Sequence, residues 1–135
     1  MKVCIIVSSF YPKISKMLTS GALLKLKKNK ISTYKIINVP GAFEIPVVIS
    51  NLINKYDAFI ALGCVIKGQT PHFNYISSSV INSIANLSIM SKKPIGNGIL
   101  TCNNIKQATK RADPNIKDKG GDAAMAVISV FDKIK

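Results

Sequence analysis

The sequence predicts a single α/β domain in which helices cover both faces of a four-stranded parallel sheet. Apolar runs of strand length alternate along the 135 residues with longer segments of helical periodicity. The runs are apolar on both faces, which is typical of parallel strands covered by helices on both sides. No linker or internal repeat interrupts residues 1–135, and a chain of this length suits one domain.

Four apolar runs are the predicted strands, and they cover residues 3–8, 33–39, 58–66 and 98–102. The first run resembles the apolar core of a signal peptide. However, it ends at Ser8, and the residues that follow do not form a small-residue cleavage site. We therefore interpret it as a strand and expect a cytoplasmic protein. No apolar run approaches the roughly 20 residues that a membrane span needs.

Five segments with helical periodicity follow the strands, at residues 13–28, 43–54, 71–90, 105–112 and 119–134. The first predicted helix turns one apolar stripe inward, formed by Ile14, Leu18, Ala22 and Leu26. The third has an equivalent stripe of Ile76, Val80, Ile84 and Leu87, and the last has one of Ala124, Val127, Ile128, Phe131 and Ile134. Pro46 is tolerated because it lies in the first turn of its helix. Right-handed crossovers then predict a three-layer α/β/α sandwich of the flavodoxin-like type.

The charge distribution argues against a nucleic-acid partner. The formal net charge of +13 would suit a polyanion or a membrane surface. However, all but one of the 19 basic residues are lysines, and they are spread along the chain. Nucleic-acid readers usually favour arginine and interleave aromatic residues, and neither pattern is seen here. We expect neither nucleic acid nor a membrane among the partners.

Three cysteines, Cys4, Cys64 and Cys102, each lie in or at the end of an apolar run. Their number is odd and their spacing does not match a metal site. We interpret them as small buried hydrophobic residues of a protein in a reducing compartment, and we expect no metal.

Residues 63–75 carry the most information about function. An apolar strand breaks at Gly68, and Thr70 and Pro71 then open a helix as N-cap and first helical residue. Unbonded amides at such a helix start attract phosphate. His72, the only histidine, lies in this first turn and can exchange a proton near neutral pH. The pattern is one residue short of a P-loop, because Gln69 stands where that motif has lysine, so an NTPase is not expected. A plain strand-to-helix turn remains the alternative.

Two further segments follow strand ends. Phe10 is either part of a packed turn or a platform for a flat ring. Glu44, the only glutamate, either stabilises a helix start or offers a carboxylate beside Phe43 to a polar heterocycle or polyol. Carboxyl ends of parallel strands meet at one edge, where ligands of such sheets bind. We therefore expect Phe10, residues 42–44 and residues 64–72 to share that edge.

Arg111, the only arginine, raises a geometric problem. Arginine binds phosphate well, but Arg111 ends the helix that leaves the fourth strand, so we expect it at the opposite edge from His72. Asn97 precedes that strand and should lie there too; Gly96 and Gly98 beside it read as a bulge. Five strand residues span roughly 16 Å, too far for a side chain to bridge. If these residues serve the same ligand, they do so from a neighbouring subunit.

Taken together, these segments resemble the lumazine synthase family over nearly the whole chain. The matching positions are Phe10, residues 39–46 (Val-Pro-Gly-Ala-Phe-Glu-Ile-Pro), residues 62–73 (Leu-Gly-Cys-Val-Ile-Lys-Gly-Gln-Thr-Pro-His-Phe), residues 98–101, Gln107-Ala108, Arg111-Ala112 and Lys119-Gly120. The family condenses 5-amino-6-(D-ribitylamino)uracil with 3,4-dihydroxy-2-butanone 4-phosphate to 6,7-dimethyl-8-ribityllumazine, phosphate and water. This is the penultimate step of riboflavin biosynthesis, and it uses no metal or organic cofactor.

The resemblance also implies roles for individual residues. His72 would transfer protons, Phe10 would stack on the pyrimidine, and Asn97, Arg111 and, less directly, Lys119 would come from the adjacent subunit, with Arg111 on phosphate. The resemblance implies that the ribityl chain and the polar groups of the ring are held by Ala42, Phe43 and Glu44. The pocket would be lined by Cys64, Val65 and Ile66, and the phosphate would be bound by Gly68, Gln69 and Thr70.

The implied assembly is a homopentamer, which in some members builds a shell of about 60 subunits; riboflavin synthase is a candidate partner. Four residues depart from the commoner pattern of the family: Tyr11, Gln69, Asn74 and Asn97. Asn74 stands where Asp is usual, so it keeps hydrogen bonding near His72 but lacks the charge. A flavin- or nucleotide-binding module without catalysis is the principal alternative, since fold alone does not determine function.

Overall fold

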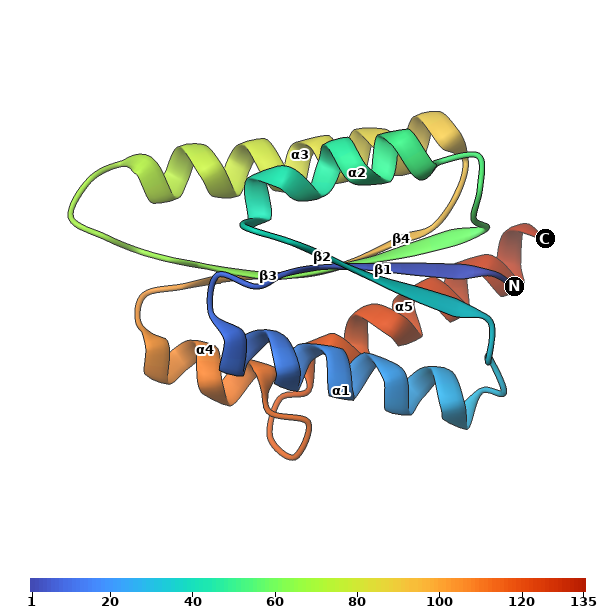
Figure 1. Cartoon of the computed structure of the whole chain (residues 1–135), viewed down its shortest axis with the longest axis horizontal. Coiled ribbons are helices and arrows are strands. Elements are labelled where there is room, and N and C mark those ends of the chain that lie inside the picture. The colour runs from blue at the N-terminus through green and yellow to red at the C-terminus, as the bar shows by residue number, and fades with distance from the viewer.

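The computed structural model describes residues 1–135 and contains the predicted parallel sheet with helices on both faces (Figure 1). The strand order is β2-β1-β3-β4, and each neighbouring pair is parallel. The strands are β1 (Val3–Ser8), β2 (Tyr34–Val39), β3 (Ala58–Ile66) and β4 (Ile95–Cys102). The predicted three-layer α/β arrangement is therefore confirmed.

The fourth strand is longer than predicted, because β4 begins at Ile95 rather than at residue 98. Gly96 and Gly98 do not form a bulge; they pair with Ile60 and Leu62 of β3. A Cβ at Gly96 would lie 2.9 Å from Cγ2 of Val127 on the covering helix. The glycines are therefore needed for close packing of that helix on the strand, and their turn propensity is overridden by tertiary contacts.

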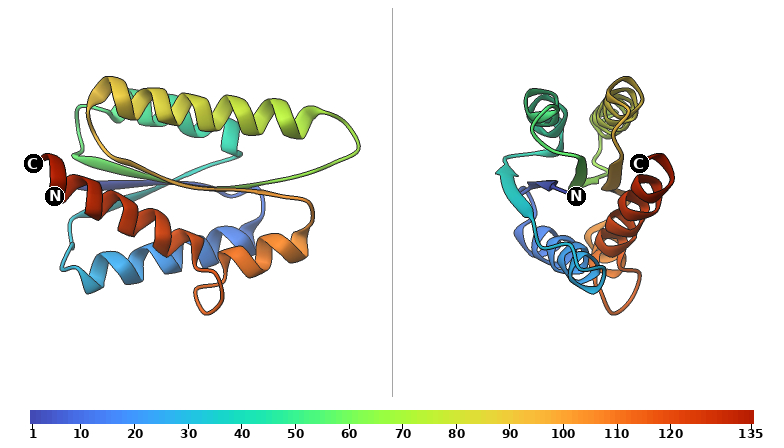
Figure 2. Two further views of the ribbon diagram at one scale, coloured as in Figure 1. Left: turned by 180° about the vertical axis from the view of Figure 1, so that it is seen from behind. Right: turned by 90° about the vertical axis from the view of Figure 1, so that its right-hand side faces the viewer.

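Helices α1 (Pro12–Lys28), α4 (Ile105–Ala112) and α5 (Lys119–Ile134) cover one face, and α2 (Ile45–Leu52) and α3 (His72–Ser91) cover the other (Figure 2). The predicted helix over residues 43–54 divides into a 3₁₀ turn, Ala42–Glu44, and α2, with Pro46 in the first turn of α2 as expected. None of the helices has both the length and the apolar character needed to cross a membrane.

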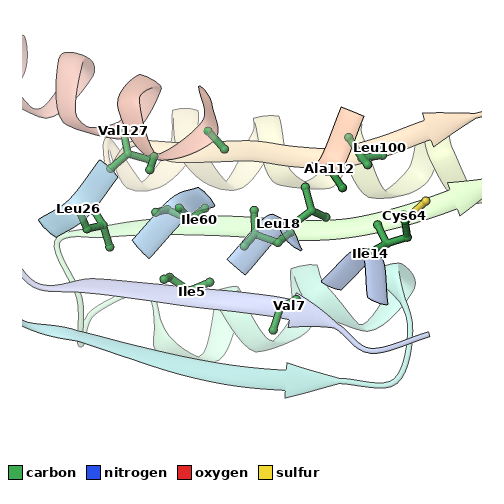
Figure 3. Packing of buried hydrophobic residues seen from close by; sticks show 14 of the residues in the cluster. Ile5, Val7, Ile14, Leu18, Leu26, Ile60, Cys64, Leu100, Ala112 and Val127 are labelled. Carbon is green, nitrogen blue, oxygen red and sulfur yellow. The ribbon is translucent and has the colours of Figure 1, made fainter. Parts of the chain in front are cut away.

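Two cores lie on the two faces of the sheet. On the first, Ile5 and Ile60 pack against Leu18 of α1, whose predicted inner stripe is fully buried (Figure 3). On the second, alternate strand residues such as Ile6 and Phe59 pack under α2 and α3. Ile134, predicted for the apolar face of the last helix, is instead 56% exposed, because α5 extends past the sheet there.

The contact between α1 and α5 depends on Gly120. A Cβ at this position would overlap the carbonyl group of Leu18, whose carbonyl carbon would be 2.8 Å away. We expect Gly120→Ala to lower the free energy of unfolding by about 1–3 kcal/mol, since two backbones would have to separate. Urea unfolding at one protein concentration measures this. Gly68→Ala is the matched control, because a Cβ there meets no atom within 4 Å; equal stability of both variants would contradict the prediction.

Candidate active site

Three segments meet where β1, β2 and β3 end. Ser8 and Val39 are in register, so the chain turns away from β1 and β2 at the same level. The Ser9 N–H donates to the Val39 carbonyl oxygen at 2.9 Å, which ties the two exits together. The 3₁₀ turn after β2 packs against β1, β3 and α3. Phe10, Ala42, Phe43 and Glu44 therefore lie at one edge of the sheet, as expected from strand polarity.

Two aromatic rings at this edge are open to solvent. Phe10 is 67% exposed and Phe43 is 58% exposed, whereas Ala42 is buried in the core under α2 and α3. The rings of Phe10 and Tyr11 form a T-shaped contact, with centroids 4.9 Å apart. Glu44 is half-buried beside Phe43. This combination of exposed rings and one carboxylate suits a flat, polar ligand better than it suits a folded core.

The third strand continues beyond its neighbour and forms a floor at the same edge. The last β1–β3 pair is Val7 with Leu62, after which Cys64, Val65 and Ile66 pair only with β4. A Cβ at Gly63 would come within 2.8 Å of the Ser8 hydroxyl, so glycine lets the end of β1 lie this close. Val65 and Ile66 are partly exposed, while Cys64 is buried.

The loop after β3 presents free amides. The backbone N–H groups of Gly68, Gln69 and Thr70 donate to no acceptor within the chain, and all three residues are exposed. Helix α3 begins at His72, one residue later than predicted, with Pro71 in the N-cap position. Thr70 is therefore not the N-cap residue; its hydroxyl accepts from the His72 N–H at 3.4 Å. His72 itself is exposed beside these amides, an arrangement suited to binding an anion next to a proton carrier.

The Cys64 thiol is not a nucleophile at neutral pH. Burial, and secondarily the neighbouring Cys102 thiol, raises the pKa of Cys64 to about 12. A thiol reacts as its thiolate, so the Cys64 side chain stays neutral and only lines the carboxyl edge of the sheet. No group of three or more His, Cys, Asp or Glu side chains is placed to hold a metal ion.

The raised pKa of Cys64 has a consequence for stability. In the unfolded chain the thiol ionises near 9.0, in the folded chain near 12, so the stability from the neutral thiol is present below pH 9 and lost as the pH rises toward 12. Between pH 9 and pH 12 the free energy of unfolding should therefore fall less in the Cys64→Ala variant than in the parent chain. Urea denaturation across the interval measures the difference; parallel pH profiles would contradict the expectation.

Arg111 lies closer to this edge than the sequence suggested. Its Nη1 is 3.4 Å from Sγ of Cys102, the last residue of β4, and 3.3 Å from Oε1 of Gln107. The expectation of an opposite-edge position was wrong, because α4 has only 8 residues and helical side chains point back toward the helix N-terminus. Gln107 was not predicted as a contact of Arg111, although its position four residues earlier on one helix was the available signal.

The helices that carry Arg111 and His72 are on different sides of the sheet. Helices α4 and α3 lie on opposite faces at the same end of the sheet (Figure 1). The Lys67 N–H donates to the Cys102 carbonyl oxygen at 2.8 Å, so the end of β4 that Arg111 contacts lies beside the start of the loop at residues 68–70.

Asn97 and Lys119, in contrast, lie away from the carboxyl edge. Asn97 lies inside β4 rather than before it, pairs with Ala61, and its exposed side chain accepts from the Ile99 N–H at 3.0 Å. Lys119 begins α5 beside the middle of α1 and forms an ion pair with Asp122 at 3.5 Å. The structure thus places the other predicted residues at the carboxyl edge, with Arg111 beside the end of β4, and leaves Asn97 and Lys119 elsewhere.

Comparison with known proteins gives a consistent result over the whole chain. The family model described as 6,7-dimethyl-8-ribityllumazine synthase matches residues 1–135. The chain belongs to the lumazine synthase family. A curated relative, 6,7-dimethyl-8-ribityllumazine synthase 1 from Rhodopseudomonas palustris (strain ATCC BAA-98 / CGA009), is 40% identical over 137 aligned residues, which cover 96% of this chain and 83% of the relative.

Membership of the lumazine synthase family confirms the resemblance seen in the sequence. It also confirms the predicted reaction class: the chain is a transferase of riboflavin biosynthesis that condenses a ribitylaminouracil with a phosphorylated butanone. The fold agrees, since a parallel sheet with helices on both faces positions the carboxyl-edge cluster.

Proposed function

We propose that this chain forms the lumazine at the carboxyl edge of its sheet, with His72 as the proton-transfer residue. The observation that supports this most is the group of unbonded amides at residues 68–70, which lies directly before His72. These amides would hold the phosphate of the butanone substrate and stabilise it as it leaves. The imidazole beside them would take up and return the protons that the condensation moves.

The chemistry needs no nucleophile from the protein. An amine of the uracil substrate attacks the ketone, and loss of water gives an imine. Loss of the C3 proton of the former butanone then expels phosphate from C4, and the resulting enol tautomerises to a new ketone at C3. The second amine attacks this ketone and closes the ring with loss of water. Because both nucleophiles belong to the substrate, a neutral, buried Cys64 is compatible with the reaction. The protein contributes alignment of two reactants, anion binding and proton transfer.

The uracil substrate would occupy the aromatic part of the edge. We assign stacking on the pyrimidine to Phe10, which is 67% exposed at this edge. Ala42, Phe43 and Glu44 would contact the ribityl chain and the ring polar groups, and Cys64, Val65 and Ile66 would form the wall beneath them. These groups lie on the exits of three neighbouring strands, so one bound molecule could contact all of them.

We further propose that the site is completed by an adjacent subunit, which supplies Asn97, Arg111 and Lys119. Helices α4 and α3 cover opposite faces of the sheet, and the family resemblance assigns Arg111 to the adjacent subunit. Helix α3 supports self-association, because its 20 residues include no Lys, Arg, Asp or Glu, although the chain carries a net charge of +13. It also exposes Tyr75, Ile89 and Met90 to solvent.

The assembly that we propose is a homopentamer with sites between neighbours, in the cytoplasm, where the three free, buried cysteines would stay reduced. Sedimentation or mass photometry would distinguish a pentamer from a shell of about 60 subunits. Riboflavin synthase is the proposed consumer of the product, and co-sedimentation with a shell would test its association.

The proposed function is tested by mixing the purified protein with both substrates. We expect lumazine fluorescence to rise with release of one phosphate per product, faster than in the uncatalysed reaction. No acceleration, together with tight binding of a flavin or nucleotide, would instead identify the chain as a non-catalytic binding module.

A further inference from the structure

The positive charge of Arg111 is not compensated by any carboxylate of its own chain. All three ion pairs of the chain join a lysine or its neighbouring turn to an aspartate, and none involves Arg111. The acceptors that its Nη1 does have are the thiol sulfur of Cys102 at 3.4 Å and the amide oxygen of Gln107 at 3.3 Å. The N–H groups on Nε and Nη2 have no acceptor within the chain. Arg111 is therefore held in place while a second side of its guanidinium stays able to bind an anion.

The side chain of Gln107 is itself fixed by the turn from β4 into α4. Its Oε1 accepts the Asn103 N–H at 2.8 Å, and its backbone N–H donates to Oδ1 of Asn104, the N-cap residue of α4, at 2.8 Å. Both partners of Oε1, the Asn103 N–H and Nη1 of Arg111, are donors, so the amide oxygen rather than the amide nitrogen must face them. The turn therefore holds one oxygen against Arg111 before any ligand binds.

The contact with Cys102 contributes less to the orientation of the guanidinium. Cys102 is the buried last residue of β4, and a thiol sulfur is only a weak acceptor. It limits how closely Arg111 approaches the sheet. The amide oxygen of Gln107 is a stronger and more directional acceptor, so it is the group that determines which way the guanidinium is turned.

We propose that Gln107 is a positioning residue for the condensation: its amide oxygen orients the Arg111 guanidinium toward the phosphate of the butanone substrate without neutralising it. This inference rests on the proposed assignment of Arg111 to that phosphate. Gln107 does not touch the substrate and acts only through Arg111. Because Arg111 is proposed to serve the adjacent subunit, Gln107 would prepare the phosphate contact of its neighbour's site.

The choice of glutamine at this position has a physical reason. A glutamate would accept from the same two donors, but its charge would pair with that of Arg111. A paired guanidinium binds phosphate less well, because the carboxylate competes for its donors and offsets its charge. An uncharged acceptor fixes the side chain and leaves the full charge for the substrate.

The first test is Gln107→Glu in the intact assembled enzyme. We expect the KM of the phosphate substrate and the inhibition constant of inorganic phosphate each to rise about ten-fold, with little change in kcat, because His72 and the amides at residues 68–70 are untouched. Thermal unfolding should be unchanged, since a carboxylate still accepts the Asn103 N–H. A role of Gln107 in the turn alone predicts normal values for both constants, and that result would overturn the proposal.

Lys106→Gln is the matched control for charge. It lowers the net charge by the same amount at the preceding, exposed residue of α4, and Lys106 has no hydrogen bond to Arg111. Its effect on both constants should be much smaller. An equal rise in the two variants would show a long-range charge effect and reject the positioning role.

A double-mutant cycle shows whether Gln107 acts through Arg111. Gln107→Ala removes the oxygen without adding charge and should raise the KM of the phosphate substrate about three-fold. In an Arg111→Ala background the same change should have no further effect, since no guanidinium remains to be oriented. Equal effects of Gln107→Ala in both backgrounds would overturn the proposal.

The same cycle separates this inference from the proposed function. A raised phosphate KM in Arg111→Ala, with normal values in Gln107→Glu and Gln107→Ala, would reject only the role of Gln107. An unchanged phosphate KM in Arg111→Ala would reject the assignment of Arg111 to phosphate, and the role of Gln107 with it.

Discussion

Replacing His72 by alanine is expected to reduce kcat about 10²–10⁴-fold, the usual contribution of a positioned general acid or base. The side chain is exposed at the first residue of α3 and packs in neither core, so the fold should be unaffected. The free amides at residues 68–70 remain, and the KM for the phosphate substrate should therefore change little.

Steady-state kinetics with both substrates measures this effect after subtraction of the uncatalysed condensation. Ser79→Ala is the matched control, because Ser79 is exposed on the same helix and has no assigned role in the site. A near-normal kcat for His72→Ala with an intact phosphate KM would reject the role of His72 without rejecting the site. Unchanged thermal unfolding would show that any loss is chemical.

Mixing two inactive variants, Phe10→Ala and Arg111→Ala, is expected to restore activity. If Phe10 comes from one subunit and Arg111 from its neighbour, random reassembly in equal amounts makes about a quarter of the sites complete. Each variant alone should be impaired differently: Phe10→Ala through the uracil substrate, because an exposed ring is lost, and Arg111→Ala through the KM of the phosphate substrate.

The control mixes Phe10→Ala with the double variant Phe10→Ala/Arg111→Ala, which contains no intact Phe10 and cannot complete a site. Subunits are dissociated in mild denaturant and reassembled, and activity is measured at limiting phosphate substrate. Recovery only in the first mixture supports a shared site. Failure of both mixtures, with assembly verified, would show that the two side chains do not meet across an interface.

The sequence alone was sufficient for the elements that bury apolar residues on a regular repeat. Strands β1 and β3 have the predicted boundaries, and the α1 stripe from Ile14 to Leu26 is buried as expected. Such patterns are local, because a run of apolar residues predicts a buried strand and an apolar residue at every fourth position predicts the buried side of a helix. The carboxyl-edge cluster follows from the same information, since parallel strands must end on one side.

Tertiary structure decided the features that depend on what packs against a residue. Gly96 and Gly98 look like a turn in sequence but lie within β4, because α5 would collide with any Cβ at Gly96. Arg111 lies beside Cys102 because a short helix directs its side chain back toward the sheet, a direction that residue counting along the strand does not capture. The glycine contacts depend on residues distant in the chain, and the Arg111 contact depends on the direction of one side chain, so apolar periodicity could not predict them.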